Sequence, residues 1–95
     1  MESDEKVFGE TKREVMKVQL VAYGIARDIL NARRLEFELN MGDSIAQLKI
    51  KLTTRYPEFS SLKSLSFAVG DEYREETFVL NDGDEVAIIP PVSGG

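Results

Sequence analysis

The sequence of 95 residues contains no cysteine and no histidine. Without cysteine the chain has no disulfide and no thiol nucleophile, and without either residue type it lacks the ligands of most zinc sites. The absence of histidine also removes the side chain that most often serves as a general base near neutral pH. These absences leave little support for an independent enzyme, and the lack of disulfides agrees with a cytoplasmic location.

The chain also lacks a long hydrophobic run and an excess of positive charge. No stretch is long enough for a transmembrane helix, and the charged residues at positions 2–6 are unlike a secretory signal. The net charge is −5 at pH 7, from 12 basic and 17 acidic residues. We therefore expect no nucleic-acid or membrane partner, whereas a basic groove on another protein would suit this acidic domain.

Length and composition predict one soluble domain. Hydrophobic residues make up 42% and charged residues 31% of the chain, which is typical of a globular protein with a single core. Residues 1–13 are polar and of mixed charge, with Val7 and Phe8 as the only large apolar pair, so we expect a flexible amino-terminal extension over residues 1–15. The folded domain is expected over residues 16–95.

Alternating hydrophobic residues predict the strands of one sheet. Residues 16–23, 34–39 and 65–69 alternate between apolar and polar side chains, which is the pattern of a strand with one buried face. Shorter edge pieces are expected at Tyr73 and over 77–80.

The main helix is indicated by its start, its apolar side and its end. Ser44 and Gln47 have the spacing of a capping box, and Pro57 ends the helix, after which we expect a loop. A short helix or helical turn is also expected over 25–30, where Ile25 and Ile29 are spaced i, i+4. The apolar side of the main helix consists of Ile45, Leu48, Leu52 and Tyr56.

The carboxyl-terminal stretch reads as a turn, a buried strand and a stop. The acidic residues 81–85 contain the turn signal Asp-Gly and lack the length of an EF-hand calcium loop, so a turn is the better interpretation. Residues 86–89 suit a buried strand. Pro90 and Pro91 end it, because proline cannot donate to a sheet. The predicted order is therefore β, β, α, β, β, β, an α+β fold with a mixed sheet packed on one main helix.

The sequence then ends in Gly94 and Gly95. Two residues without side chains form a thin segment that fits a narrow active site. The α-carboxylate of Gly95 is a poor electrophile until a partner enzyme converts it to an acyl-adenylate, which a sulfur nucleophile can attack. The alternative is a disordered tail that happens to end in glycine.

The same residues resemble a known family, the small subunit of molybdopterin synthase, also called molybdopterin-converting factor subunit 1. The family has the ubiquitin-like β-grasp fold, which agrees with the element order above. The likeness covers about residues 16–95. It rests on Met16-Lys17-Val18, Ala22, Arg27, Asp82-Gly83-Asp84-Glu85-Val86-Ala87 and Pro90-Pro91-Val92-Ser93-Gly94-Gly95.

The resemblance implies a sulfur carrier that is not catalytic alone. A partner enzyme that uses ATP and magnesium would adenylate Gly95, which would become a thiocarboxylate, so this chain would bind no cofactor and no metal itself. The tail, at about residues 90–95, would then enter the large synthase subunit and give its sulfur to cyclic pyranopterin monophosphate, for molybdenum cofactor biosynthesis. The family implies a heterotetramer of small and large subunits.

The resemblance also implies partner-binding residues. If Val86 and Ile88 face the core, their neighbours in the strand face outward. Ile89 and Val21 match family positions against the large subunit, with ordinary sheet packing as the alternative. The full set expected to bind partners is Ile89, Ala87, Val21, Tyr73, Arg27, Pro90, Pro91, Val92 and Ser93, and the reacting end is Gly94 with Gly95.

Two other functions stay open. Another ubiquitin-like sulfur carrier, for thiamine or transfer-RNA thiolation, would share the fold and the Gly-Gly end, although residues 90–93 favour the molybdopterin branch. A plain β-grasp interaction module with an inert tail is the rival from a different class. It predicts that deleting Gly94 and Gly95 leaves function intact.

Overall fold

The computed structural model describes residues 14–62 and 64–91. The predicted extension over 1–15 therefore lies almost wholly outside the described residues, and the domain boundary stays a prediction. The predicted order of β, β, α, β, β, β is confirmed. The elements are β2 (Val15–Ala22), α1 (Ile25–Leu30), β3 (Arg34–Asn40), α2 (Ile45–Arg55), the 3-10 helix η1 (Pro57–Ser61), β4 (Ser66–Val69), β5 (Glu72–Arg74) and β6 (Glu85–Ile89).

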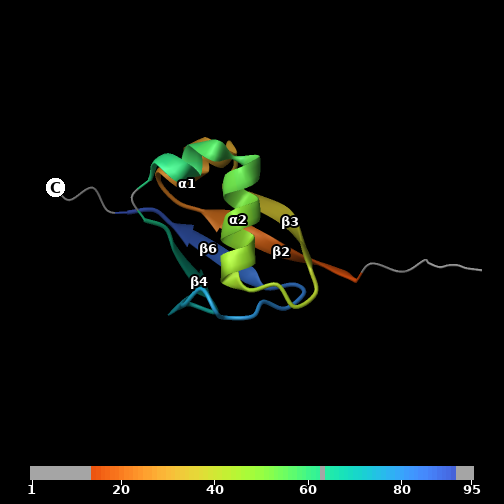
Figure 1. Ribbon diagram of the computed structural model, residues 1–95. Helices are drawn as coiled ribbons and strands as arrows, with labels where there is room; N and C mark the ends of the chain where they lie inside the picture. The colour runs from red at the N-terminus through yellow and green to blue at the C-terminus, as the bar shows by residue number, and fades with distance from the viewer. Residues whose placement is uncertain (1–13, 63, 92–95) are drawn as a thin grey trace, which may run out of the picture.

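The strands form one mixed sheet in the order β3-β2-β6-β4-β5. The last strand of the chain, β6, lies in the middle, where it pairs parallel to β2 and antiparallel to β4. The β2–β3 and β4–β5 pairs are antiparallel. Helix α2 crosses one face of this sheet, and β6 ends on the side opposite to the start of β2 (Figure 1). The predicted sheet packed on one main helix is confirmed.

The core lies between α2 and the sheet, because the alternating strands and the apolar helix side point at each other. The predicted buried positions of the strands and of α2 are confirmed, with Tyr56 partly buried against the core. Burial of this kind stabilises by about 25 cal/mol for each Å² of apolar surface removed from water. Among the core residues are Met16, Val18, Leu20, Ala22, Phe37, Leu39, Ile45, Leu48, Leu52, Phe67, Leu80, Val86 and Ile88.

The start of α2 has the capping box that the sequence predicts. The Ser44 backbone N–H donates to Oε1 of Gln47 at 2.7 Å, and both halves of the box are present. Ser44 also forms a β-bridge with Val79, which ties the helix start to the predicted edge piece. Asp43 accepts from Nζ of Lys51 at 2.8 Å. The residues around this cap therefore fix where α2 begins.

Two segments differ from their prediction in detail. Helix α1 is confirmed, but its buried residues are Ala26 and Leu30, whereas Ile25 is 46% exposed. The predicted loop after Pro57 is a 3-10 helix, because proline is preorganised for a first helical position. This turn brings Phe59 into the core, with its ring edge-on to Tyr56 and the centroids 6.4 Å apart.

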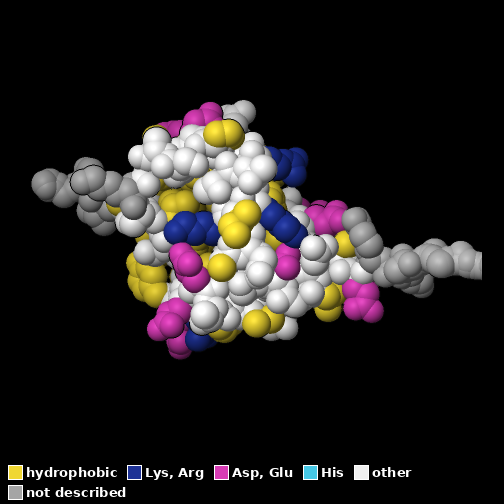
Figure 2. All heavy atoms as spheres, in the orientation of Figure 1, with side chains coloured by type: hydrophobic (Ala, Val, Ile, Leu, Met, Phe, Trp, Pro, Cys, Tyr) yellow, Lys and Arg dark blue, Asp and Glu magenta, His cyan; other side chains and the backbone are white. Residues whose placement is uncertain are grey.

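The surface that carries α2 mixes charges of both signs. Figure 2 shows Lys and Arg side chains beside Asp and Glu on this side, with hydrophobic atoms in small separate areas. Isolated apolar atoms of this kind are normal on a soluble surface. Within residues 14–62 and 64–91, no helix is long and apolar enough to cross a membrane.

Candidate functional site

Strand β6 presents alternate residues to the two faces of the sheet. Val86 and Ile88 are fully buried in the core. Ala87 and Ile89 are partly buried and lie on the opposite face, away from α2. The predicted orientation of this strand is confirmed, and its central place puts Ala87 in the middle of the outer sheet face.

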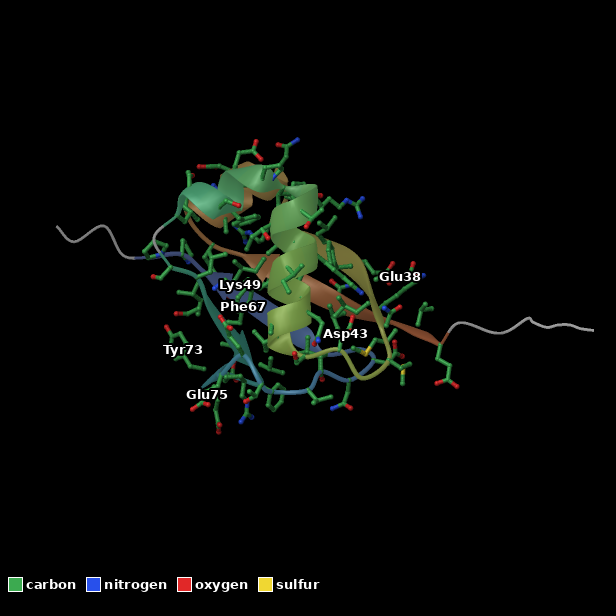
Figure 3. All side chains as sticks on the ribbon, viewed as in Figure 1. Glu38, Asp43, Lys49, Phe67, Tyr73 and Glu75 are labelled. Carbon is green, nitrogen blue, oxygen red and sulfur yellow. The ribbon has the colours of Figure 1, made fainter. Side chains whose placement is uncertain are left out.

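The register aligns several predicted site residues in one row across the sheet. Val21 lies opposite Ala87, and Ala87 lies opposite Ala68 on its other side. Ala68 in turn pairs with Tyr73, and Val21 pairs with Arg34. Because directly paired residues point to the same face, this row spans all five strands of the outer face. Tyr73, which is 69% exposed, lies at the far edge on β5 (Figure 3).

The accessibility expected for Val21 needs a correction. Its side chain belongs to the outer face and not to the core cluster, yet it is only 8% exposed. The Arg34 guanidinium reaches Glu85 with 2.5 Å between Nη2 and Oε2, and these two residues belong to the strands on either side of β2. The ion pair therefore crosses β2 between its outward residues Gln19 and Val21, since Gln19 pairs with Glu85 and Val21 with Arg34.

A hollow of about 380 Å³ lies on this outer face. We call it the sheet hollow. Val21, Ala68 and Ala87 line it, together with the Arg34 and Glu85 ion pair. Small side chains in the middle of a sheet leave room above the backbone, so this part of the face is suited to receive a larger side chain of a partner.

The chain leaves the sheet beside the end of β2. Ala22 pairs with Ile88 in the parallel register, so the residues that follow both strands run next to each other. A Cβ placed on Gly24 would lie 3.5 Å from Cγ of Pro90, at ordinary van der Waals distance. Gly24 has φ +55°, a conformation that suits glycine. Pro90 and Pro91 are partly buried. We call the place where these two prolines leave the sheet beside Gly24 the tail exit.

Arg27 is brought to the same end of the sheet by α1. It lines a second hollow of about 400 Å³ that adjoins the sheet hollow through Val21, Tyr23 and Arg34. Sequence reasoning missed Arg33 and Arg34, because only the fold shows that they line one hollow with Arg27. We call this second site the arginine hollow. It is lined by Val21, Ala22, Tyr23, Gly24, Arg27, Arg33 and Arg34.

The reacting end of the chain lies outside the described residues. Val92, Ser93, Gly94 and Gly95 belong to this part, so their predicted roles stay predictions. Among the residues that are described, no three Asp or Glu side chains are placed to share a metal ion. What the structure places together is the row from Val21 to Tyr73, the tail exit and the arginine hollow.

Comparison with known proteins identifies curated relatives over most of the chain. A molybdopterin synthase sulfur carrier subunit from Chlamydomonas reinhardtii is 34% identical over 83 residues, covering 84% of this chain and 100% of the relative. A protein of the same name from Mycobacterium tuberculosis is 32% identical over 83 residues, covering 85% of this chain and 100% of the relative.

Solved structures share the fold. A putative molybdopterin-converting factor subunit 1 from Pyrococcus furiosus has a TM-score of 0.74 at 24% identity, covering 81% of this chain and 99% of that one. A ubiquitin from Caldiarchaeum subterraneum has a TM-score of 0.59 at 18% identity, covering 85% and 99%. The small chain in a complex of subunits 1 and 2 of the molybdopterin-converting factor from Helicobacter pylori has a TM-score of 0.57 at 23% identity, covering 84% and 100%.

These likenesses confirm the expected ubiquitin-like β-grasp fold. The sequence model of the ThiS family matches residues 21–95, which is most of the chain and includes its carboxyl-terminal block. This protein therefore belongs to the ThiS family, and its curated relatives are molybdopterin synthase sulfur carrier subunits.

Proposed function

We propose that this chain is the sulfur carrier subunit of molybdopterin synthase and that it carries sulfur as a thiocarboxylate on Gly95. The observation that carries the proposal is the 34% identity to a sulfur carrier subunit over that relative's full length. The Pro-Pro-Val-Ser-Gly-Gly ending and the central position of β6 support it.

The proposed chemistry takes place at the Gly95 carboxyl carbon. A carboxylate oxygen attacks the α-phosphorus of ATP in a partner adenylating enzyme, which forms the acyl-adenylate and releases pyrophosphate. A hydrosulfide ion supplied by a sulfur donor then attacks the acyl carbon, AMP leaves with the electron pair of the acyl–oxygen bond, and loss of the S–H proton yields the thiocarboxylate. ATP and magnesium belong to the partner in this scheme, so the chain contributes a reactive end and a docking surface.

The carrier would then deliver sulfur to the large synthase subunit. The complex of converting-factor subunits 1 and 2 from Helicobacter pylori supports a large-subunit partner. We propose that the row from Val21 to Tyr73 contacts this subunit while the tail reaches its active site. There the sulfur would pass to cyclic pyranopterin monophosphate. The heterotetramer and the cytoplasmic location stay predictions.

Reconstitution tests the proposal and separates it from its rivals. Thiocarboxylated chain is mixed with the large subunit from the same organism and cyclic pyranopterin monophosphate, and dithiolene formation is measured. Activity that disappears when Gly94 and Gly95 are deleted, with unchanged thermal unfolding, is the expected result. Sulfur transfer only to a thiazole synthase or to transfer RNA would assign the chain to another sulfur-carrier branch. Partner binding by the full-length chain without any sulfur transfer, and equal binding by the deletion variant, would leave an interaction module.

A further inference from the structure

Three arginines from two elements surround the arginine hollow. Arg27 comes from α1, whereas Arg33 and Arg34 come from the turn before β3 and its first residue. None of the residues that line this hollow is acidic. The chain as a whole carries a net charge of −5, so the hollow is a local positive site on an acidic protein.

Two of these guanidinium groups lack a carboxylate partner. Arg34 pairs with Glu85, but within the described ranges neither Arg27 nor Arg33 forms an ion pair. Asp28 lines an adjoining hollow with both arginines and does not pair with either of them. Two charged groups are therefore available to an external ligand.

The remaining lining suits a protein segment. Val21, Ala22 and the Tyr23 side chain supply apolar surface, and the arginines supply charge around it. An apolar centre with a polar rim, rich in Tyr and Arg, is the composition of a protein–protein interface. The Arg34–Glu85 pair shows that a carboxylate is accommodated on this face, where Nη2 of Arg34 donates to Oε2 of Glu85. In general, guanidinium groups bind carboxylates strongly and often through two parallel hydrogen bonds.

The position of the hollow indicates which protein would occupy it. Gly24 lines the hollow and also lies close to Pro90 at the tail exit, since a Cβ placed on Gly24 would be 3.5 Å from Cγ of Pro90. A partner that takes up the tail therefore lies next to Arg27 and Arg33. We propose that the arginine hollow binds an acidic segment of the large synthase subunit when that subunit takes up the tail. The carboxylates of this segment would pair with Arg27 and Arg33. This inference rests on the proposed sulfur-carrier function.

Such a contact would orient the carrier before docking. Most of the domain repels an acidic surface, whereas the arginine hollow attracts one at the place where the tail leaves. Long-range attraction of this kind raises association rates and is screened by salt. The main effect of the arginines should therefore be on the association rate of the complex.

A pair of charge reversals tests this proposal. Arg33→Glu removes a hollow arginine whose side chain makes no described contact, and its backbone bond to Ala22 is kept. Lys49 lies on α2 (Figure 3), and Lys49→Glu makes the same change in net charge while it replaces the exposed pair with Glu76 by two like charges. Association of each full chain with the large subunit from the same organism is measured by stopped flow at low and high salt, after thermal unfolding has shown that both variants fold.

For Arg33→Glu we expect an association rate about tenfold lower at low salt, with the difference lost near 1 M salt, where the Debye length is about 3 Å. Arg33→Lys should keep most of the rate, because it keeps the charge, and Lys49→Glu should stay within about twofold of the wild type. Equal rates for all variants, or an equal loss for Arg33→Glu and Lys49→Glu, would overturn the proposal. If the wild-type chain does not bind the large subunit at all, the proposed function fails and this inference falls with it.

Discussion

The Arg34 side chain on β3 bonds Glu85 on β6 across the intervening strand β2, with 2.5 Å between Nη2 and Oε2. The two residues are 51 positions apart in the sequence, and only the parallel pairing of β2 with β6 brings them together. The pair lies between the sheet hollow and the arginine hollow, because Arg34 lines both. It therefore marks the boundary between the sheet hollow, whose lining also includes Asp71 and Asp84, and the arginine hollow, whose lining includes no acidic residue.

Glu85→Gln is expected to change stability very little. More than half of each side chain in the Arg34–Glu85 pair is exposed, and exposed ion pairs contribute about 0–1 kcal/mol. Urea unfolding at low salt should show a loss within that range, and the loss should shrink at high salt because of screening. A loss above about 2 kcal/mol would mean that the pair supports the fold and is more than a surface contact.

Ile89→Asp should weaken binding to the large subunit. The residue is partly buried on the outer face of β6, next to the tail exit, and a carboxylate there would be desolvated in the complex. Burying an unpaired polar group costs about 1–3 kcal/mol, which corresponds to roughly 10- to 100-fold in affinity. Calorimetric titration measures the change.

The matched control for Ile89→Asp is Ile50→Asp. Ile50 is 64% exposed on α2, on the other side of the domain, so the same substitution should leave the affinity unchanged. Equal affinities of the two variants would remove Ile89 from the interface.

Val21→Asp should lower both binding and stability, unlike Ile89→Asp. Val21 is only 8% exposed, beside the Arg34–Glu85 pair, so the new carboxylate would be desolvated even in the free chain. We expect a fall in thermal midpoint of several degrees, together with weaker binding. An unchanged midpoint would show that the side chain is more accessible than its burial indicates.

Leu48→Ala should strongly destabilise the domain. Leu48 is fully buried on the side of α2 that faces the sheet, and truncating such a residue typically costs about 2–5 kcal/mol. Ile50→Ala, on the exposed side of the same helix, should cost less than about 0.5 kcal/mol. Urea unfolding of both variants checks the contrast, and similar losses would mean that the buried side of α2 is assigned incorrectly.

Local patterns in the sequence predicted most of the fold. The Ser44–Gln47 spacing and the apolar repeat of α2 were sufficient because both depend on residues within one or two turns. The outward direction of Ala87 and Ile89 followed from the alternation of β6. In contrast, Ala26 of α1 is buried instead of Ile25, because the packing of a six-residue helix is decided by its neighbours more than by its own pattern.

The candidate site was less predictable because it depends on pairing between distant segments. The alignment of Val21, Ala87 and Tyr73 required the register of four strands, which no local pattern specifies. The closeness of Pro90 to Gly24 follows from the parallel β2–β6 pair. Arg33 carried no signal in the sequence, since a single arginine in a turn is ordinary. Its role emerges only where it lines one hollow with Arg27 beside the tail exit.

The most direct test of the sulfur-carrier account is the intact mass of the chain after incubation with ATP, magnesium, an adenylating enzyme and a sulfur donor. The account predicts an increase in mass equal to the replacement of one oxygen by sulfur. Fragmentation should map this increase to Gly95, and it should be absent without ATP. A chain extended by one residue beyond Gly95 should show no gain. An unchanged mass of the folded wild-type chain with several adenylating enzymes would contradict the account and leave the tail inert.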